Sequence, residues 1–147
     1  MILKVKKGKK ILEKTAQLAE RLKIEVFAVG GFVRDLYLSQ EGKDIDFVVL
    51  GDALEFANAF KKRFRSGEVV TYPRFGTAML HYGDYKLEFV SARSELYDSH
   101  SRKPKVKRAD LQNDLDRRDF TINTLVLEIT PAHFGRLINL LHGLEDI

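Results

Sequence analysis

The chain has 147 residues, with 25 lysines and arginines against 21 aspartates and glutamates, so its net charge is only +4. This length forms one domain that buries about two-thirds of its unfolded surface without covalent cross-links. The lack of cysteine excludes disulfides and cysteine-bound zinc, and no apolar run approaches the roughly 20 residues that span a membrane. The basic N-terminus lacks the apolar segment and cleavage site of a signal peptide, which favours a cytoplasmic protein with no membrane contact.

The first half of the chain alternates helical periodicity with short apolar runs. The predicted elements are a helix over 8–22, a strand over 26–29, a helix over 32–38, a strand over 45–50, and a helix from an N-cap at Asp52 to about Arg63. A strand, a short helix and a second strand have the order of a βαβ unit, so we expect these first strands to run parallel.

Three shorter strands are expected next, over 68–72, 77–82 and 85–91, and Gly83-Asp84 between the last two is a hairpin signal. Strands of the parallel type followed by an antiparallel hairpin predict a mixed sheet with flanking helices, an α/β (α+β) fold. From Arg93 to about Asp116 the chain is polar and without a steady period. A loop of this length in a compact domain is usually functional or disordered.

Gly30-Gly31, followed by Asp44-Ile45-Asp46, is the most informative feature of the sequence. A glycine turn leaves backbone N–H groups at a helix N-terminus, where the dipole favours an anion, and Arg34 adds a planar donor for phosphate. Asp44 and Asp46 alternate along a strand, so they share one face with Cα atoms roughly 6.5–7 Å apart. Such carboxylates repel each other unless a cation lies between them. The pattern predicts metal-dependent phosphoryl or nucleotidyl transfer.

Each of these features also has a simpler interpretation. Two glycines are usually only a turn, an Asp-x-Asp pair is often a solvated strand end, and Arg34-Asp35 is compatible with a surface ion pair of little energetic consequence. Their order and close spacing, with hydrophobic strands between them, favour the functional interpretation.

Further candidates lie downstream. Glu88 stands between apolar residues of a predicted strand, where an unpaired charge is costly, so we expect it beside the aspartates as a base or metal ligand; an exposed strand position is the alternative. Arg117-Arg118-Asp119 suits phosphate and ribose contacts, or else a helix cap with ion pairs. A basic cluster is a candidate for RNA phosphates, with solvated surface as the alternative; it consists of Arg102, Lys103, Lys105, Lys107 and Arg108.

Three motifs in this order resemble the class II tRNA nucleotidyltransferase and bacterial poly(A) polymerase family. They are Gly30-Gly31-x-Val33-Arg34-Asp35, Asp44-x-Asp46, and Arg117-Arg118-Asp119-Phe120-Thr121-Ile122-Asn123, and the resemblance covers the chain from about residue 24 to its end. The resemblance implies that residues 1–147 form a catalytic head with a DNA-polymerase-β-like nucleotidyltransferase fold. Such a head adds CMP or AMP from CTP or ATP to the 3′ end of tRNA or another RNA.

The resemblance also implies a role for each candidate residue. Gly30, Gly31 and Arg34 would bind the triphosphate, and Asp44 and Asp46 would bind two Mg²⁺ ions, which Mn²⁺ could replace. Glu88 would be the third carboxylate. The nucleotide would also meet Arg118, Asp119 and Asn123, the last two near its ribose.

Family members continue into a neck, which selects the base, and into body and tail domains that hold tRNA. The ending over 143–147 resembles the entry into that neck, so we expect the N-terminal part of a longer protein. The segment over 72–78 is closer to CCA-adding relatives, which favours tRNA CCA, CC or A addition over a poly(A) polymerase. A non-catalytic RNA-binding module is less favoured because it leaves three acids unexplained, and a dinucleotide-binding domain would need a Gly-x-Gly-x-x-Gly turn.

Overall fold

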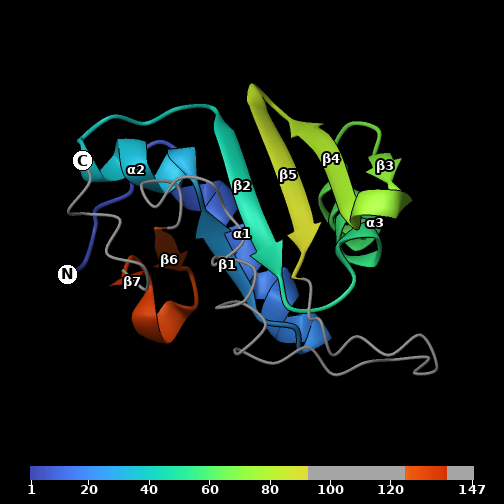
Figure 1. The fold of residues 1–147 in the computed structure, drawn as a ribbon, viewed down its shortest axis with the longest axis horizontal. Coiled ribbons are helices and arrows are strands. Elements are labelled where there is room, and N and C mark those ends of the chain that lie inside the picture. Colours follow the sequence, from blue (N-terminus) through green and yellow to red (C-terminus); the bar gives the residue numbers. More distant parts are fainter. Residues whose placement is uncertain (93–124, 139–147) are drawn as a thin grey trace.

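A seven-stranded mixed sheet forms the centre of the protein in the computed structural model, which describes residues 1–92 and 125–138 (Figure 1). The strand order is β3-β4-β5-β2-β1-β6-β7. The strands are β1 (Val26–Val29), β2 (Asp44–Val49), β3 (Val70–Tyr72), β4 (Thr77–Tyr82), β5 (Tyr85–Ser91), β6 (Val126–Glu128) and β7 (Leu137–Ile138). Among these described strands only β2 and β5 pair in parallel. The predicted mixed sheet with flanking helices is confirmed.

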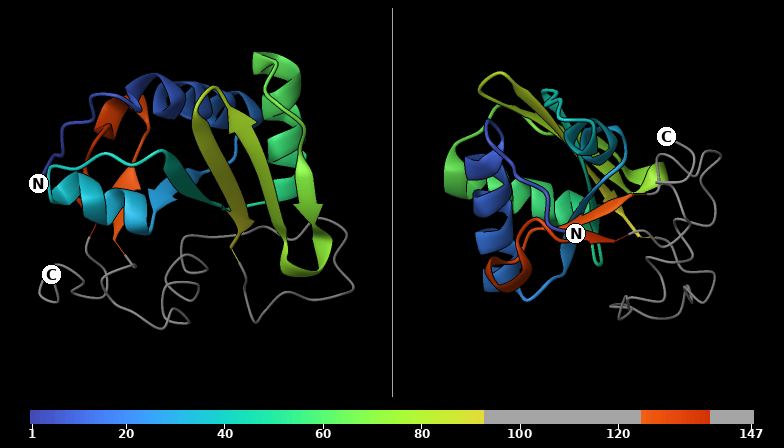
Figure 2. Two further views of the ribbon diagram at one scale, coloured as in Figure 1. Left: turned by 90° about the horizontal axis from the view of Figure 1, so that it is seen from above. Right: turned by 90° about the vertical axis from the view of Figure 1, so that its left-hand side faces the viewer.

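Two long helices, α1 (Lys9–Leu22) and α3 (Ala53–Phe64), cover the same face of the sheet (Figure 2). The short α2 (Gly31–Tyr37) follows β1 directly, and two single 3₁₀ turns, η1 (Pro73–Phe75) and η3 (Pro131–His133), lie in connections. The predicted N-cap of α3 is confirmed, because the Asp52 carboxylate accepts hydrogen bonds from the N–H groups of Leu54 and Glu55 at 2.9 and 3.3 Å. In the described part of the chain, no helix combines the length and apolarity needed to cross a membrane.

The expected parallel arrangement of the first two strands is wrong. β1 and β2 are antiparallel, with Val29 opposite Asp46 and Val26 opposite Val49. A parallel connection must carry the chain back along the whole length of a strand. The seven residues of α2 rise only about 10 Å, and β2 begins where β1 ends, so the chain reverses direction there instead. The parallel neighbour of β2 is β5, which comes after α3 and the β3–β4 pair.

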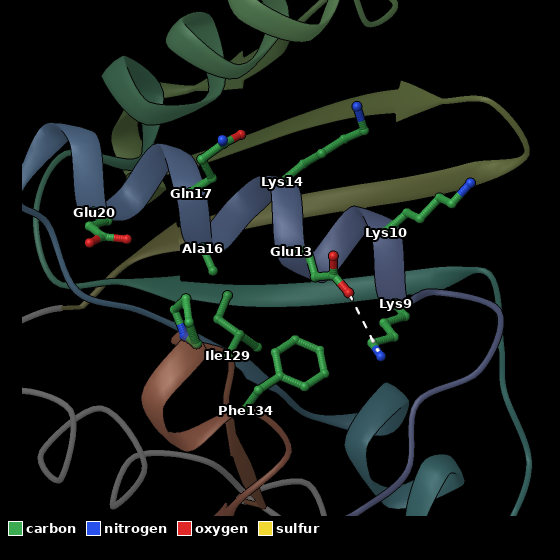
Figure 3. A pocket seen from close by; sticks show the side chains of 10 residues that line it. Lys9, Lys10, Glu13, Lys14, Ala16, Gln17, Glu20, Ile129 and Phe134 are labelled. Atoms are coloured by element: carbon green, nitrogen blue, oxygen red, sulfur yellow. Dashed lines mark ion pairs between the residues drawn. The ribbon is translucent and has the colours of Figure 1, made fainter.

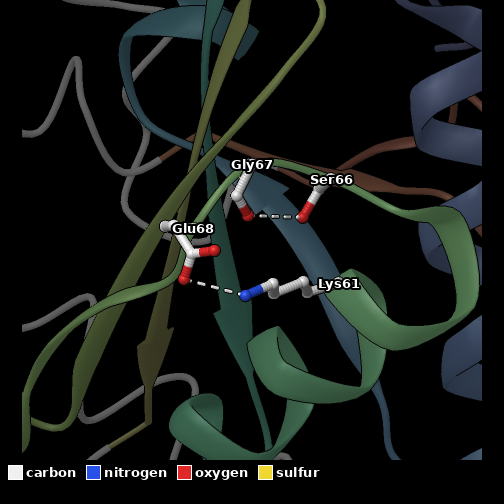
Figure 4. A network of polar contacts seen from close by, with 4 residues as sticks. All are labelled: Lys61, Ser66, Gly67 and Glu68. Carbon is white, nitrogen blue, oxygen red and sulfur yellow. Dashed lines mark hydrogen bonds and ion pairs between the residues drawn. The ribbon is translucent and has the colours of Figure 1, made fainter.

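The start of β3 also differs from the prediction, because the strand begins at Val70 rather than at residue 68. The preceding residues make other contacts. Glu68 accepts a hydrogen bond from the Lys61 ammonium of α3 at 2.8 Å, and the Ser66 hydroxyl donates to the Gly67 carbonyl at 3.0 Å (Figure 4). The Gly67 N–H donates to the carbonyl of His81. These contacts tie the turn to α3 and β4 before pairing with β4 begins.

The first residues of the chain are paired with some of the last described ones. Leu3 donates its N–H to the Gly135 carbonyl at 2.7 Å, and Leu137 donates to the Met1 carbonyl at 3.0 Å. Gly135 has φ +86, and a Cβ there would lie 2.6 Å from the Leu3 carbonyl oxygen, so only glycine allows this close approach. The N-terminal segment is therefore part of the sheet's β7 edge.

The main core lies between the sheet and the helices α1 and α3. Phe89 of β5 is its centre, with ring centroids 5.1 Å from Phe47, 5.2 Å from Phe56 and 5.9 Å from Phe60. A smaller cluster forms on the other face of the sheet and includes Phe27, Val29, Val48, Leu50, Ala92 and Val126. Because side chains alternate along a strand, the neighbours of the core residues in β2 and β5 point away from the helices.

Replacing Phe89 by alanine is expected to lower the free energy of unfolding by about 3–5 kcal/mol. The substitution removes a fully buried ring and leaves a cavity between its three aromatic neighbours. Urea denaturation, monitored by circular dichroism, measures this change in the free energy of unfolding. Phe75→Ala is the matched control: Phe75 is 56% exposed, and we expect its replacement to change stability by less than about 0.5 kcal/mol. Equal losses in the two variants would contradict the core assignment.

Candidate active site

Four charged residues occupy the sheet face opposite α1 and α3, where β2 and β5 run side by side. The parallel register places Asp46 beside Glu88 and Asp44 beside Lys86. Neighbouring strands are about 4.8 Å apart, and partners in register share a face. Asp46 and Glu88 are half-buried, whereas Asp44 is exposed. The structure thus brings the predicted third carboxylate next to the predicted pair.

Lys86 belongs to this group and was not predicted from the sequence. It is half-buried and lies opposite Asp44, so β5 presents a cation and an acid beside the two acids of β2. The spacing Lys86-x-Glu88 repeats the spacing Asp44-x-Asp46, and that repeat is the signal in the sequence. The repeat brings the four side chains together only because the two strands pair in this register. The strands are 42 residues apart, so no local sequence pattern indicates that register. The cation offsets part of the repulsion among the three carboxylates.

The two glycines leave room for functional side chains. Gly30 has φ +74 and ψ −147, a conformation that only glycine adopts readily. A Cβ at Gly30 would lie 3.2 Å from the Asp46 Oδ2, and a Cβ at Gly31 would lie 3.4 Å from the Arg34 Nη2. The carboxylate and the guanidinium therefore approach the same two-residue turn. The Gly30 carbonyl accepts hydrogen bonds from Val33 and Arg34, which starts α2 at this point.

The guanidinium of Arg34 is held by its neighbour in sequence. Its Nε and Nη2 lie 3.1 and 3.0 Å from Asp35 Oδ1, and both side chains are about one-third exposed. The ion pair between Arg34 and Asp35, which was the alternative interpretation, is thus present in the structure. An exposed pair of this kind adds little stability. Its effect is to orient the guanidinium beside the glycine turn.

The donor set suits magnesium bound with the help of a substrate. Within residues 1–92 and 125–138, no group of three or more His, Cys, Asp or Glu side chains is arranged to hold a metal ion by itself. Magnesium commonly binds through one or two carboxylates and completes its shell with water and phosphate oxygens. Asp44 and Asp46 on one face of β2, with Glu88 alongside, supply such carboxylates without a closed protein cage.

A second residue that sequence patterns did not indicate is Glu41, three positions before Asp44. Its Oε1 accepts hydrogen bonds from the N–H groups of Lys7 and Gly8 at 2.9 and 3.2 Å, and its Oε2 from Lys6 at 3.1 Å. Gly8 is the N-cap position of α1 and has no side chain to accept these bonds. Glu41 therefore caps a helix more than 30 residues away and fixes the loop that leads into β2.

Glu41→Ala is expected to destabilise the fold by about 1–3 kcal/mol, because three backbone N–H groups at the start of α1 lose a charged acceptor. Thermal unfolding at several denaturant concentrations measures the loss. Glu13→Ala removes the same charge from the exposed side of α1, where the Lys9 ammonium is 4.0 Å away, and should cost less than about 0.5 kcal/mol. Indistinguishable variants would refute the capping role.

A groove of about 720 Å³ lies on another part of the molecule, between α1 and residues 129–134 (Figure 3). Its lining comprises Lys9, Lys10, Glu13, Lys14, Ala16, Gln17, Glu20, Ile129, Pro131 and Phe134. None of the predicted site residues is among them. The candidate site is therefore formed by the carboxylates and the glycine turn, and this groove is separate from it.

The remaining predicted residues lie outside the described ranges. They are the nucleotide-contact candidates Arg118, Asp119 and Asn123 and the basic cluster formed by Arg102, Lys103, Lys105, Lys107 and Arg108. Their roles stay predictions.

Comparison with known proteins gives the same family as the motifs. Residues 26–147 match the poly(A) polymerase head domain. The A-adding tRNA nucleotidyltransferase of Aquifex aeolicus is 44% identical over 124 residues, which is 84% of this chain and 15% of that protein. Similar solved structures include a tRNA-processing enzyme in an apo form, with a TM-score of 0.83 and 37% identity over 99% of this chain. Another is a tRNA nucleotidyltransferase complexed with a primer tRNA and an incoming ATP analog, with a TM-score of 0.74 and 39% identity over 90% of this chain.

The matched region is a minor part of these relatives. The chain spans 36% of each of the two solved structures and 15% of the Aquifex protein. Relatives named for adding A, CC or CCA are all matched, at 44, 35 and 33% identity respectively. The similarity thus identifies the family and the nucleotidyltransferase fold, and the product is a separate question.

Proposed function

Because this chain belongs to the poly(A) polymerase head-domain family, we propose that it is the catalytic head of a metal-dependent RNA nucleotidyltransferase. Its substrates are ATP or CTP and the 3′ end of a tRNA, and each transfer releases pyrophosphate. The observation that carries the proposal is the register that aligns Asp46 with Glu88 beside the glycine turn. Proteins named for this activity match the chain over most of its length.

The carboxylates would act at the reacting phosphate. Magnesium held by Asp44 and Asp46 would make the RNA 3′ hydroxyl a better nucleophile and neutralise charge on the phosphates. Glu88, one strand away, would accept a hydrogen bond from that hydroxyl and orient it. Lys86 beside Asp44 would limit the repulsion among the acids before substrate binds.

The glycine turn and Arg34 would hold the triphosphate. The two glycines allow the substrate's phosphates to approach the backbone, and the guanidinium, oriented by Asp35, supplies planar N–H donors to the phosphate oxygens. These contacts do not read the base. We therefore propose that in the longer relatives the choice between ATP and CTP depends on regions outside the matched part. In this chain, we propose that Arg118, Asp119 and Asn123 contact the nucleotide and its ribose.

The test is a primer-extension assay with three tRNAs, one lacking CCA, one lacking only the terminal A, and one complete. CTP and ATP are offered separately, with and without magnesium. Metal-dependent addition to the shortened tRNAs supports the proposal, and the pattern of products separates A, CC and CCA addition. Repeated addition of adenylate would identify a poly(A) polymerase instead. RNA binding with neither transfer nor metal-dependent nucleotide binding would identify a non-catalytic RNA-binding module.

A further inference from the structure

The sheet face that carries the candidate site extends across two more strands. Glu88 of β5 pairs with Met79 of β4, and Met79 pairs with Val70 of β3. Tyr72, two residues after Val70, pairs with Thr77. Partners in register share a face, so Val70 and Tyr72 lie on the same face as Asp46 and Glu88.

This margin of the sheet exposes aromatic side chains. Among the large hydrophobic side chains exposed in the described residues, the two aromatic ones are Tyr72, at 46%, and Phe75, at 56%. In the sequence they stand on either side of Pro73-Arg74, of which Arg74 is exposed, and Val70, two residues before Tyr72, is 42% exposed. We refer to Tyr72, Arg74 and Phe75 as the β3 platform. Two exposed aromatic rings and an exposed arginine within four consecutive residues have the chemistry that binds unpaired nucleotides.

The backbone of the β3 platform is fixed to the strands that carry the site. Gly76 donates its N–H to the Pro73 carbonyl at 3.2 Å, and Ser91 at the end of β5 donates to the Gly76 carbonyl at 2.8 Å. The Thr77 hydroxyl donates to the Phe75 carbonyl at 3.3 Å. Rings on a fixed backbone lose less conformational freedom when they bind a partner. The platform is thus built on the same rigid sheet as the carboxylates.

The proposed reaction sets the side from which RNA must arrive. In-line displacement places the attacking hydroxyl opposite the leaving pyrophosphate. With the triphosphate beside Gly30, Gly31 and Arg34, at the β1 side of Asp46, the RNA 3′ end approaches from the β5, β4 and β3 side. This step rests on the function proposed above.

We propose that the β3 platform is a stacking site for unpaired nucleotides near the 3′ end of the RNA substrate, with Tyr72 as its principal contact. Three strand spacings and two residues along the strand separate Tyr72 from Asp46, which is about 16 Å. Stacked nucleotides advance about 3.4 Å each, so Tyr72 meets a base within roughly five positions of the reacting end. A ring stacks on any base, so the site adds affinity without reading sequence.

The first experiment compares Tyr72→Ala, Tyr72→Phe and Thr71→Ala in the full chain, using tRNA that lacks its terminal A. Tyr72→Ala should raise the KM for tRNA about 5-fold or more and leave the KM for ATP unchanged. Tyr72→Phe keeps the ring and should restore the KM for tRNA. Thr71 is exposed on the opposite face of β3, so its replacement is the matched control. An unchanged KM for tRNA in Tyr72→Ala would overturn the proposal.

A second measurement does not depend on catalysis. 2-Aminopurine is placed in turn at each of the last five positions of the RNA, and its fluorescence is recorded on binding. Quenching at one position, lost in Tyr72→Ala and kept in Tyr72→Phe, supports stacking. If the unmodified protein transfers no nucleotide but shows this quenching, the proposed function fails and the platform stands. A change of oligomeric state in Tyr72→Ala, with quenching unaltered, would assign the surface to protein contacts and overturn the inference.

Discussion

Asp46→Ala is expected to reduce nucleotide transfer at least 100-fold while leaving the fold intact. Among the carboxylates of the described residues, Asp46 both has Glu88 beside it and lies against the glycine turn. Its loss removes negative charge at the point where we propose that metal and phosphates meet. Removing a single group that stabilises transition-state charge typically costs 10²–10³-fold. Circular dichroism and urea denaturation of the variant distinguish loss of activity from loss of the fold.

Single-turnover transfer to tRNA lacking its terminal A measures this effect, and calorimetry of ATP binding with and without magnesium measures it without chemistry. In the unmodified protein ATP binding should depend on magnesium, and in the variant that dependence should disappear. Asp84→Ala is the matched control: Asp84 lies in the β4–β5 turn with its side chain 82% exposed, 3.5 Å from Lys43. A variant of Asp46 that keeps full activity would overturn the assignment of the site.

Gly30→Ala is expected to lower activity at least 10-fold and stability by about 1–3 kcal/mol. Its φ of +74 is unfavourable for any side chain, and the added Cβ would meet the Asp46 carboxylate at 3.2 Å. The carboxylate must then shift by a few tenths of an ångström. Misplacement of a reacting group reduces the rate even when the fold survives.

Gly83→Ala provides the comparison for backbone strain alone. Gly83 also has a positive φ, +58, but a Cβ there meets no atom within 4 Å. We expect a stability cost of about 1–2 kcal/mol and no change in transfer rate. Urea denaturation and the single-turnover assay on both variants separate the two effects. Equal activity losses would show that the contact with Asp46 is not what the Gly30 variant disrupts.

Local patterns in the sequence were enough to locate several elements. Apolar runs bounded by turn residues predicted β1, β4 and β5 with the bounds that the structure has, and the Asp52 cap of α3 was also predicted. These features depend on residues that are neighbours in the chain. The common face of Asp44 and Asp46 was predicted for the same reason, since the two carboxylates are two positions apart in one strand.

Features that depend on distant pairing could not be predicted in the same way. The antiparallel pairing of β1 and β2 depends on where a short helix directs the chain, not on the periodicity of either strand. On the β5 side, the neighbours of Asp44 and Asp46 come from about 40 residues later: Glu88 was predicted from its position among apolar residues, whereas Lys86 was not. Glu41 lies in the loop before β2, whereas its three backbone partners lie at residues 6–8.

The position of β1 has a consequence for how the protein is made. β1 lies between β2 and β6, and the residues that pair with its second side are 126–128. A ribosome adds about 5–20 residues per second, so β1 emerges roughly 5–20 seconds before this partner emerges. During that interval an entirely apolar strand presents one unpaired edge, the kind of surface on which nascent chains aggregate. Slowing of translation between β2 and β6 would lengthen this exposure, and a chaperone bound to residues 26–29 would shorten it.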